Sequence, residues 1–334
     1  RRPRTTAPRP RPTTRSADPT SSLVDVQILV VTNPAARRTK PHLSRWVADR
    51  LSDVAKVDVI ATTHRNHATE IAREAATRGL DAVVALGGDG TVNEVLQGLA
   101  GSPTALAVLP GGSTNVYGRI LGLPRSLTGA TSILFQALKE NRVRQVPVGR
   151  ANDRWFAWCA GFGYDADVVR EVEWHPRMKR YLGQTSFLYH GWEARKRAAE
   201  TTIDIEAGPA RPKGRQRGAL KRERVLGAAV VCNADPYTFF GPLPSRMCPE
   251  ATLERGLDLT ALTDISLPAL LQTMRKALTG RDVRDLPWIT GWHDREYYEL
   301  TASRPLPVHT DGDPVGTTQH LRVEVVPDAL QLIV

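Results

Sequence analysis

Apolar and polar positions form repeating blocks in the first part of the chain. Short apolar runs rich in β-branched residues, typical of buried strands, lie at residues 26–31, 57–61, 82–86 and 104–109. Each run is followed by a stretch in which apolar residues recur three and four positions apart, as on one face of a helix. Residues 26–140 therefore predict four strands and four helices in alternation, an α/β fold whose parallel sheet carries helices on both faces.

The pattern changes after about residue 145, where short strand-like runs are separated by Gly and Pro turns. The runs are 145–148, 155–160, 202–205, 226–233, 257–262, 297–301, 320–326 and 330–334, with helices expected near 165–200 and 267–280. They predict a second, mostly antiparallel β domain. We divide the chain into a disordered basic tail (1–24), an α/β domain (25–145) and a β-rich domain (146–334) whose last strand could return to the first domain.

Charge is concentrated in two segments of a chain with a net charge of +10. Residues 1–24 contain six Arg and one Asp, and residues 207–224 contain seven Lys or Arg and one Glu. We interpret both as flexible segments that attract an anionic membrane surface, at about 1 kcal/mol per basic residue near the lipid. Aromatic side chains are not interleaved with these charges, so nucleic acid is not expected as a partner.

Other sequence features bear on location. No apolar run reaches the roughly 18 residues of a transmembrane helix, and no secretory signal is recognisable. Three cysteines without CxxC spacing favour a reducing compartment. We expect a cytoplasmic protein that is peripheral at the inner face of the membrane. The sequence leaves open whether the protein forms a homodimer. The sequence starts without Met, which we interpret as truncation or processing.

The stretch AVVALGGDGTVNE, residues 82–94, predicts a strand, a tight glycine turn and the start of a helix. Thr91 and Glu94 fit a capping box, which would begin the helix at Thr91. Glycines let the backbone approach a phosphate, and the free N–H groups of a helix start favour an anion. Asp89 would repel phosphate unless a cation bridges the two, so we interpret it as linked to magnesium.

Two further turns accompany the first. Pro110-Gly111-Gly112-Ser113-Thr114-Asn115 repeats the strand–turn–helix pattern, and Thr310-Asp311-Gly312-Asp313 places two carboxylates near the C-terminus. The loops 32–40, 62–68, 87–91 and 110–115 all follow predicted strands and should share the edge of the sheet where ligands bind. The late acidic turn is either a plain hairpin or a base or metal-linked acid brought beside this edge. Walker A, G-x-G-x-x-G, kinase catalytic-loop and G-x-S-x-G motifs are absent.

Taken together, residues 87–94 (GGDGTVNE), 109–115 (LPGGSTN) and 311–313 (DGD) resemble the diacylglycerol kinase catalytic-domain family. This family includes bacterial soluble lipid kinases and sphingosine and ceramide kinases, with a fold distantly similar to that of NAD kinases. The resemblance runs from about residue 26 to 334. It implies that residues 25–145 bind nucleotide, that residues 146–334 bind lipid, and that the γ-phosphate of ATP passes to a lipid hydroxyl, most simply that of diacylglycerol.

The resemblance also implies roles for individual residues. ATP contacts would come from Asn33, Pro34, Thr62 (or Thr63), Gly87, Gly88, Asp89, Gly90, Thr91, Asn93, Glu94, Gly112, Ser113, Thr114 and Asn115. Asp89 would lie near the phosphates and Mg²⁺, and either Asp311 or Asp313 would accept the proton of the lipid hydroxyl. Tyr164 and Asp165 would line the lipid pocket, with Phe162 and the aromatic residues of 174–192 offering apolar surface. Ala251–Asp258 matches a segment at which some members bind a structural magnesium.

Three departures from the family pattern keep other functions open. Val116 stands where a carboxylate is usual, Asp313 where Glu is usual, and Glu254-Arg255 where an acidic pair is usual. A kinase of sphingoid bases or other lipids, an NAD-kinase-like enzyme acting on a soluble nucleotide, and a catalytically silent membrane-binding protein are the alternatives.

Overall fold

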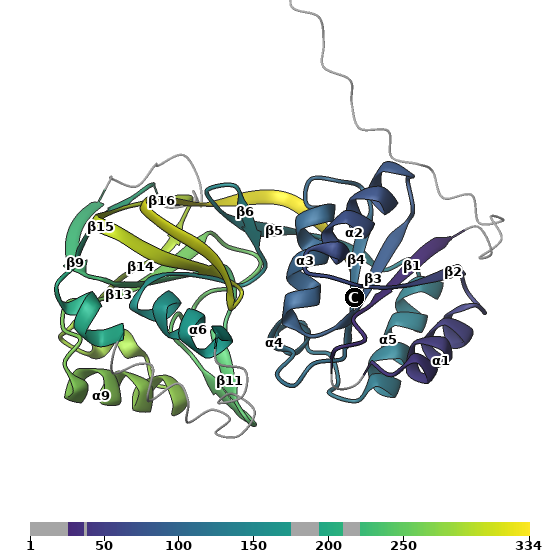
Figure 1. Cartoon of the computed structure of the whole chain (residues 1–334), viewed down its shortest axis with the longest axis horizontal. Helices are drawn as coiled ribbons and strands as arrows, with labels where there is room; N and C mark the ends of the chain where they lie inside the picture. Colours follow the sequence, from purple (N-terminus) through teal and green to yellow (C-terminus); the bar gives the residue numbers. More distant parts are fainter. Residues whose placement is uncertain (1–25, 37–38, 175–193, 210–220) are drawn as a thin grey trace, which may run out of the picture.

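The chain has two halves that lie side by side (Figure 1). The computed structural model describes residues 26–36, 39–174, 194–209 and 221–334. The N-terminal half alternates strands and helices, whereas the other half consists mainly of antiparallel strands. The predicted fold, an α/β domain followed by a β-rich domain, is confirmed. Within the described ranges, no helix has the length and apolar character needed to cross a membrane.

The N-terminal half is a parallel sheet between two layers of helices. Its elements are β1 (Gln27–Thr32), α1 (Pro41–Leu51), β2 (Lys56–Ala61), α2 (His67–Thr77), β3 (Ala82–Gly87), α3 (Asp89–Leu99), β4 (Ala105–Pro110), α4 (Val116–Ile120) and α5 (Leu127–Lys139). The strands lie in the order β4, β3, β1, β2. Because successive strand residues face opposite sides, Leu29 and Val31 pack in the cluster of α2 and α3, whereas Ile28 and Val30 pack in that of α1 and α5.

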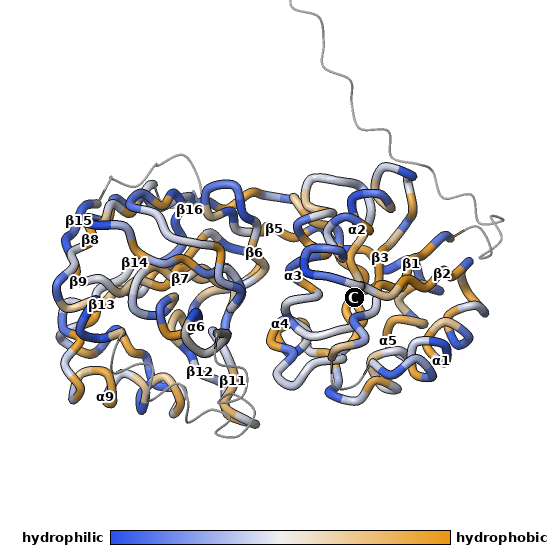
Figure 2. The backbone as a smooth tube through the Cα atoms, in the orientation of Figure 1, coloured by the Kyte–Doolittle hydropathy of each residue, from blue (hydrophilic) through white to orange (hydrophobic). Residues whose placement is uncertain are grey.

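The C-terminal half is built on antiparallel strands. Its elements are β5 (Val143–Ala151), β6 (Arg154–Phe156), β7 (Cys159–Gly163), α6 (Tyr164–Trp174), β8 (Thr202–Ala207), β9 (Lys221–Leu226), β10 (Ala228–Cys232), β11 (Thr238–Phe240), β12 (Leu243–Ser245), β13 (Leu257–Leu262), α9 (Leu267–Leu278), the 3₁₀ helix η3 (Val283–Asp285), β14 (Ile289–Arg295), β15 (Tyr297–Thr310) and β16 (Asp313–Ile333). Apolar side chains of these strands, such as Phe162 and Tyr298, form a core of their own, and Figure 2 shows the apolar stretches running along them.

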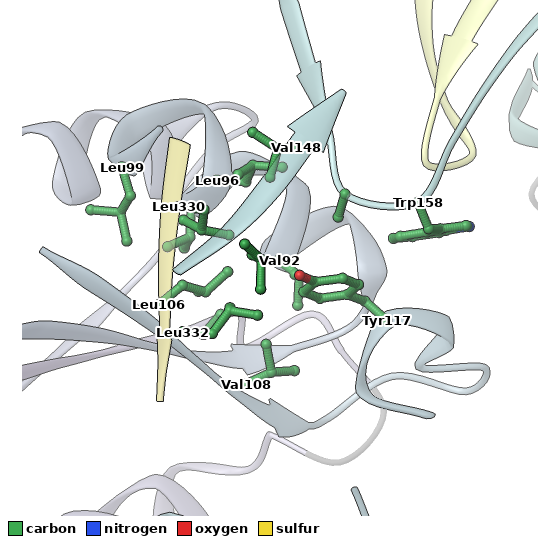
Figure 3. Packing of buried hydrophobic residues seen from close by; sticks show 14 of the residues in the cluster. Val92, Leu96, Leu99, Leu106, Val108, Tyr117, Val148, Trp158, Leu330 and Leu332 are labelled. Atoms are coloured by element: carbon green, nitrogen blue, oxygen red, sulfur yellow. The ribbon is translucent and has the colours of Figure 1, made fainter. Parts of the chain in front are cut away.

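Strand β16 belongs to both halves. It is 21 residues long, pairs antiparallel with β15 and β5, and reaches β4, where Leu332 lies opposite Leu106 in a parallel pairing. The two strands predicted over 320–326 and 330–334 are therefore one, with a register shift between Val326 and Leu330. Leu330 and Leu332 complete the core beneath α3 (Figure 3).

Two other strand predictions need correction. The run 155–160 is broken between β6 and β7, because the backbone N–H groups of Ala157 and Trp158 are directed at a buried carboxylate instead of a neighbouring strand. Part of the basic segment 207–224, predicted as a flexible loop, forms strand β9, because Arg222 and Arg224 lie opposite Glu206 and Asp204 on β8 and pair with them. Residues 1–24 and 210–220 lie outside the described ranges.

Candidate active site

The four loops predicted to share one edge of the sheet do adjoin one another. The backbone N–H of Asn33 donates to the carbonyl of Leu86 (3.4 Å), and that of Thr62 donates to the carbonyl of Thr32 (2.8 Å). The second glycine turn joins the first through the Gly111 N–H and the Gly87 carbonyl (2.8 Å). This edge lies at the carboxyl ends of β1 to β4, where parallel sheets bind ligands.

The two glycine turns are packed backbone against backbone. A Cβ atom on Gly112 would lie 2.6 Å from the Gly88 Cα, and a Cβ on Gly111 would lie 2.9 Å from the Gly87 Cα. Real Cβ atoms do not approach backbone so closely, so only glycine fits at these positions. The pairing leaves the start of α3 without side chains over residues 87–88, and a phosphate can approach its N–H groups.

Replacing Gly112 by alanine should destabilise the fold by about 1–3 kcal/mol, because the added methyl group must push the two turns apart. The matched control is Gly90→Ala, since a Cβ there meets nothing within 4 Å and alanine is the better helix former. Thermal or urea unfolding of the two variants checks the prediction. Equal stability of both variants would contradict the tight packing of the turns.

Asp89 lies where the two turns meet. It is the first residue of α3, and its Oδ1 accepts the backbone N–H of Tyr117 in α4 at 3.2 Å. Burial raises the pKa of Asp89 to about 6; the Asp311 charge adds to the rise, and the Tyr117 N–H opposes it. A carboxylate held in such surroundings gains from a nearby cation, because opposite charge favours its ionised form. The residue type and position fit a phosphate-linked Mg²⁺, which uses one or two carboxylates plus substrate oxygens.

The predicted capping box is wrong. Helix α3 begins at Asp89 with Gly88 as its N-cap, so Thr91 lies inside the first turn. The carboxylate of Glu94 instead accepts the backbone N–H groups of Asn66 (3.0 Å) and Ala68 (3.2 Å) at the start of α2. Glu94 therefore fixes the neighbouring helix, and its predicted contact with ATP remains a prediction.

The other residues predicted to contact ATP surround this edge. Asn33 holds its own turn, its Oδ1 accepting the N–H of Ala35 at 2.9 Å, and Pro34 beside it is exposed. Asn115 closes the second turn, with its side chain bonded to both the N–H (2.8 Å) and the carbonyl (3.0 Å) of Gly112. The remaining polar side chains of this set at the turns are half-buried or exposed; they are Thr62, Ser113 and Thr114. Val116, in place of a carboxylate, packs in the core beneath α3.

Asp311 is buried and hydrogen-bonded on both oxygens. Oδ1 accepts the N–H groups of Trp158 (3.0 Å) and Cys159 (3.1 Å), and Oδ2 accepts those of Ala157 (2.7 Å) and the Asn93 side chain (2.9 Å). Burial raises the pKa of Asp311, and these four donors oppose the rise. Asn93, predicted as an ATP contact, is fully buried and thus links α3 to the β-rich half.

Asp313 is placed differently from Asp311, only two residues away. Its side chain is 25% exposed, and its Oδ1 lies 2.6 Å from Arg65, a residue between β2 and α2 in the other half. Its Oδ2 lies 3.4 Å from Arg154 on β6. The carboxylate thus reaches the loop between β2 and α2, one of the four loops at the shared sheet edge, across the boundary between the halves. Arg65 and Arg154 belong to the site, and sequence reasoning missed them because neither lies in a glycine or acidic motif.

Asp165, at the start of α6, joins a partly buried chain of hydrogen bonds. It accepts from the Tyr237 hydroxyl (2.7 Å), and its other oxygen lies 2.5 Å from the His309 Nε2. The His309 Nδ1 in turn accepts the backbone N–H of Gly312 (3.2 Å), so the ring carries its proton on Nε2 and donates it to Asp165. The chain connects Asp165 with the acidic turn.

Only some of the aromatic residues predicted to offer apolar surface to a lipid lie within the described ranges. Phe162 does not contribute, because its side chain lies in the core of the β-rich half. Tyr164 is half-buried and packs at the edge of a small cluster with Leu226 and Leu270. The side chains of residues 174–192 lie outside what the structure describes.

In the segment matched to a structural magnesium site, two carboxylates lie beside basic side chains of the chain itself. Glu254 pairs with Arg144, and the Asp258 carboxylate lies 2.7 Å from the Nδ1 of His293. Among the described residues, three metal-ligating side chains come close enough to share an ion only at His64, His67 and Glu70. There the Nδ1 of His67 already accepts the N–H of Thr63 at 3.1 Å. The chain's own arginine and histidine side chains therefore balance the carboxylates of residues 251–258.

Comparisons with known proteins identify the family of the chain. Residues 27–151 match the family model described as the diacylglycerol kinase catalytic domain, and residues 159–334 match that of the YegS C-terminal NAD kinase beta sandwich-like domain. The chain belongs to the diacylglycerol kinase catalytic-domain family. The predicted resemblance is thus confirmed, with the two models meeting close to the boundary between the halves.

Relatives in sequence support this membership, and solved structures share the fold. A protein named diacylglycerol kinase from Bacillus subtilis (strain 168) is 28% identical over 295 residues, which cover 86% of this chain and 89% of the relative. The fold is similar to that of a diacylglycerol kinase from Bacillus anthracis str. Sterne, with a TM-score of 0.66 at 19% identity over 92% of this chain and 96% of the other. An NAD kinase from Archaeoglobus fulgidus, solved with ATP, is similar at a TM-score of 0.50 and 14% identity, over 92% and 94% of the two chains.

Proposed function

We propose that this member of the diacylglycerol kinase catalytic-domain family transfers the γ-phosphate of ATP to the hydroxyl group of diacylglycerol, giving phosphatidic acid. The observation that carries the proposal is the convergence of three parts. The paired glycine turns open the start of α3 to a phosphate, Asp89 lies beside them, and Asp313 faces the same edge from the other half. The relative from Bacillus subtilis with the name diacylglycerol kinase supports this choice of acceptor.

In the proposed reaction, positioning and charge supply most of the catalysis, as in phosphoryl transfer generally. The backbone N–H groups at residues 88–91 bind phosphate oxygens. Asp89 is the side chain that would hold Mg²⁺, which neutralises phosphate charge when bound. The acceptor oxygen forms a bond to the γ-phosphorus, its proton passes to the Asp313 carboxylate, and ADP leaves with the electrons of the broken P–O bond. Asp311, whose oxygens are occupied by four donors, holds the turn in place.

We also propose that the protein acts as a peripheral membrane protein at the inner face of the membrane. The basic residues of 1–24 and 207–224 would attract anionic lipid, although Arg222 and Arg224 already pair with acidic side chains of β8. Because exposed charges are screened by salt, this part of the attraction should weaken as salt is raised.

A transfer assay with several acceptors tests the proposed function. Purified protein with Mg²⁺ and γ-labelled ATP should label diacylglycerol, and should label sphingosine and NAD at least about a hundredfold more slowly. Asp89→Asn should lower the rate by at least about a hundredfold. An amide would hold Mg²⁺ poorly, so the negative charge that develops on the phosphates in the transition state would no longer be neutralised. Asp49→Asn, an exposed change on α1, should keep the full rate.

Two outcomes would contradict the proposal. Label that appears only in the soluble nucleotide would favour an NAD-kinase-like enzyme. Full activity of Asp89→Asn would show that the reaction does not take place at the glycine turns.

A further inference from the structure

Helix α9 exposes three of its large apolar side chains to solvent. Leu267, Leu271 and Met274 are 45%, 51% and 37% exposed, and their spacing of four and three residues places them on one stripe. The side chains that α9 buries are small ones, Ala269, Thr273 and Ala277. A surface helix ordinarily turns its large apolar residues toward the core. Helix α9 does so with Leu270, which packs against a buried cluster, but leaves the other three outside.

The neighbouring hairpin of β11 and β12 carries another exposed apolar side chain. Leu243, at the start of β12, is 52% exposed. The hairpin is tied to the helix, because the Arg246 N–H donates to the carbonyl of Ala277 in α9 at 3.0 Å. Both α9 and the hairpin lie along the lower edge of the β-rich half in Figure 1, where Figure 2 shows apolar stretches of α9. We call Leu243, Leu267, Leu271 and Met274 the docking face.

The charges beside the docking face are basic. Arg275 is exposed next to Met274 on α9, and Arg281 is exposed just after the helix. Of the acidic residues that flank the helix, Asp282 accepts from Arg284 and Asp285 from Lys276, whereas exposed Asp264 before the helix accepts from the neutral Ser266. An apolar stripe with a basic flank is the signature of a helix that lies in the plane of an anionic membrane surface.

The size of the docking face distinguishes a membrane from a second copy of the chain. A standard protein interface involves roughly 20–30 residues a side, whereas here four apolar side chains protrude from one helix and one hairpin. Insertion into the boundary of headgroups and acyl chains needs no complementary protein surface, and each buried apolar group contributes on its own.

The docking face is also connected to the catalytic edge. Arg119 of α4 donates to the carbonyls of Gly241 (3.1 Å) and Pro242 (3.2 Å) in the turn of the hairpin, and its guanidinium lies 3.2 Å from the ring centroid of Phe239. Helix α4 begins directly after the second glycine turn. A membrane bound at the hairpin therefore lies next to the half that carries Asp89.

We propose that Leu243, Leu267, Leu271 and Met274 insert into the surface of an anionic membrane, with Arg275 and Arg281 at the headgroups, and that this contact holds the site at the lipid. The use of the contact for catalysis rests on the proposed function, but the contact itself does not. The basic tail and loop would add attraction that salt screens, whereas insertion of the docking face would persist at high salt.

Co-sedimentation of the full chain with vesicles tests the docking face directly. Vesicles of equal parts phosphatidylcholine and phosphatidylglycerol should bind Leu271→Glu at least about tenfold more weakly than the parent chain, because burial of a leucine is lost and a charge is added. Met274→Glu should act in the same direction. The matched control is Trp46→Glu on α1, whose side chain is 38% exposed away from the docking face and whose replacement should leave binding unchanged.

A second readout separates this inference from the proposed function. Transfer to diacylglycerol in vesicles should fall in Leu271→Glu in step with binding, while transfer to a short-chain diacylglycerol dispersed as monomers should equal that of the parent chain. A parent chain that transfers to neither acceptor, yet binds vesicles tenfold better than Leu271→Glu, would end the proposed function and leave the docking face supported.

Two results would overturn the docking face. One is equal vesicle binding by the parent chain, Leu271→Glu and Met274→Glu at roughly 1 M salt, where charge attraction is screened within about 3 Å. The other is a dimer of the parent chain, seen in sedimentation, that Leu271→Glu converts to monomer without a change in vesicle binding, since the face would then be covered by a second copy.

Discussion

Asp313→Asn should lower kcat for phosphoryl transfer by about a hundred- to ten-thousand-fold, the usual contribution of a general base. An amide cannot accept the proton of the acceptor hydroxyl, although it keeps the shape of the side chain and one of the two hydrogen bonds that the carboxylate accepts from Arg65 and Arg154. Because the side chain is partly exposed, the melting temperature should change by only a few degrees. The measurement is kcat at saturating ATP and diacylglycerol, beside a thermal melt.

The control for this prediction is Asp153→Asn, a neighbouring exposed aspartate in the turn before β6, which should keep full activity. Activity of Asp313→Asn within threefold of the parent chain would remove Asp313 from the role of base. A loss of activity that follows a large loss of stability would likewise count against it, since the effect would then be structural.

Asp311→Ala should destabilise the fold by about 3 kcal/mol or more. The change leaves four buried donors without an acceptor, the backbone N–H groups of residues 157–159 and the Asn93 amide. Each unsatisfied buried group costs about 1–3 kcal/mol. Urea unfolding gives the free energy, and Asp313→Ala is the matched control, expected to cost less than about 1 kcal/mol at its partly exposed position.

Comparing the stability costs of Asp311→Ala and Asp313→Ala tests which of the two aspartates accepts the proton, a question that the sequence leaves open. A cost below about 1 kcal/mol for Asp311→Ala would mean that its carboxylate is not the anchor of this turn. Asp311 would then be available for catalysis, and the assignment of the proton acceptor to Asp313 would lose its main support.

The α/β half was predictable because its signals are local. Runs such as Ala82–Leu86 are apolar throughout, as in strands buried on both faces, and the glycine turns after them mark the edge where Asp89 lies. The same logic explains why the four loops were correctly assigned to one edge, since the carboxyl ends of parallel strands always meet there.

The errors come from partners far away in the chain. Thr91 and Glu94 have the spacing of a capping box. The Glu94 carboxylate instead accepts the backbone N–H of Ala68 at the start of α2, which lies 26 residues earlier in the chain. The break between β6 and β7 depends on Asp311, which lies 154 residues after Ala157. The basic segment looked flexible because its charges suggest solvent, yet Arg222 and Arg224 face acids on β8.

The same contrast between local signals and distant partners applies to the residues of the site. Motif residues such as Gly88, Gly112 and Asp89 could be located from spacing alone. Arg65, Arg154, His309 and Tyr237 could not, because their partners are distant in the sequence: Arg65 meets Asp313 across the two halves, and the other three meet theirs within the β-rich half. For His309, the sequence did offer one signal. It lies two residues before Asp311, in the acidic turn that the resemblance to the family had already singled out.

Strand β16 has a consequence for how the enzyme can move. The halves are joined by β5 and β16, which pair from Ala151 opposite Val323 to Val148 opposite Val326 and, after a register shift, from Val146 opposite Leu330 to Val143 opposite Ile333. Such a ribbon resists bending within its plane but twists readily. Opening of the site for exchange of nucleotide and lipid should thus be a torsion of this ribbon, with Arg65 and Asp313 sliding past each other, and not the free swing of two domains on a tether.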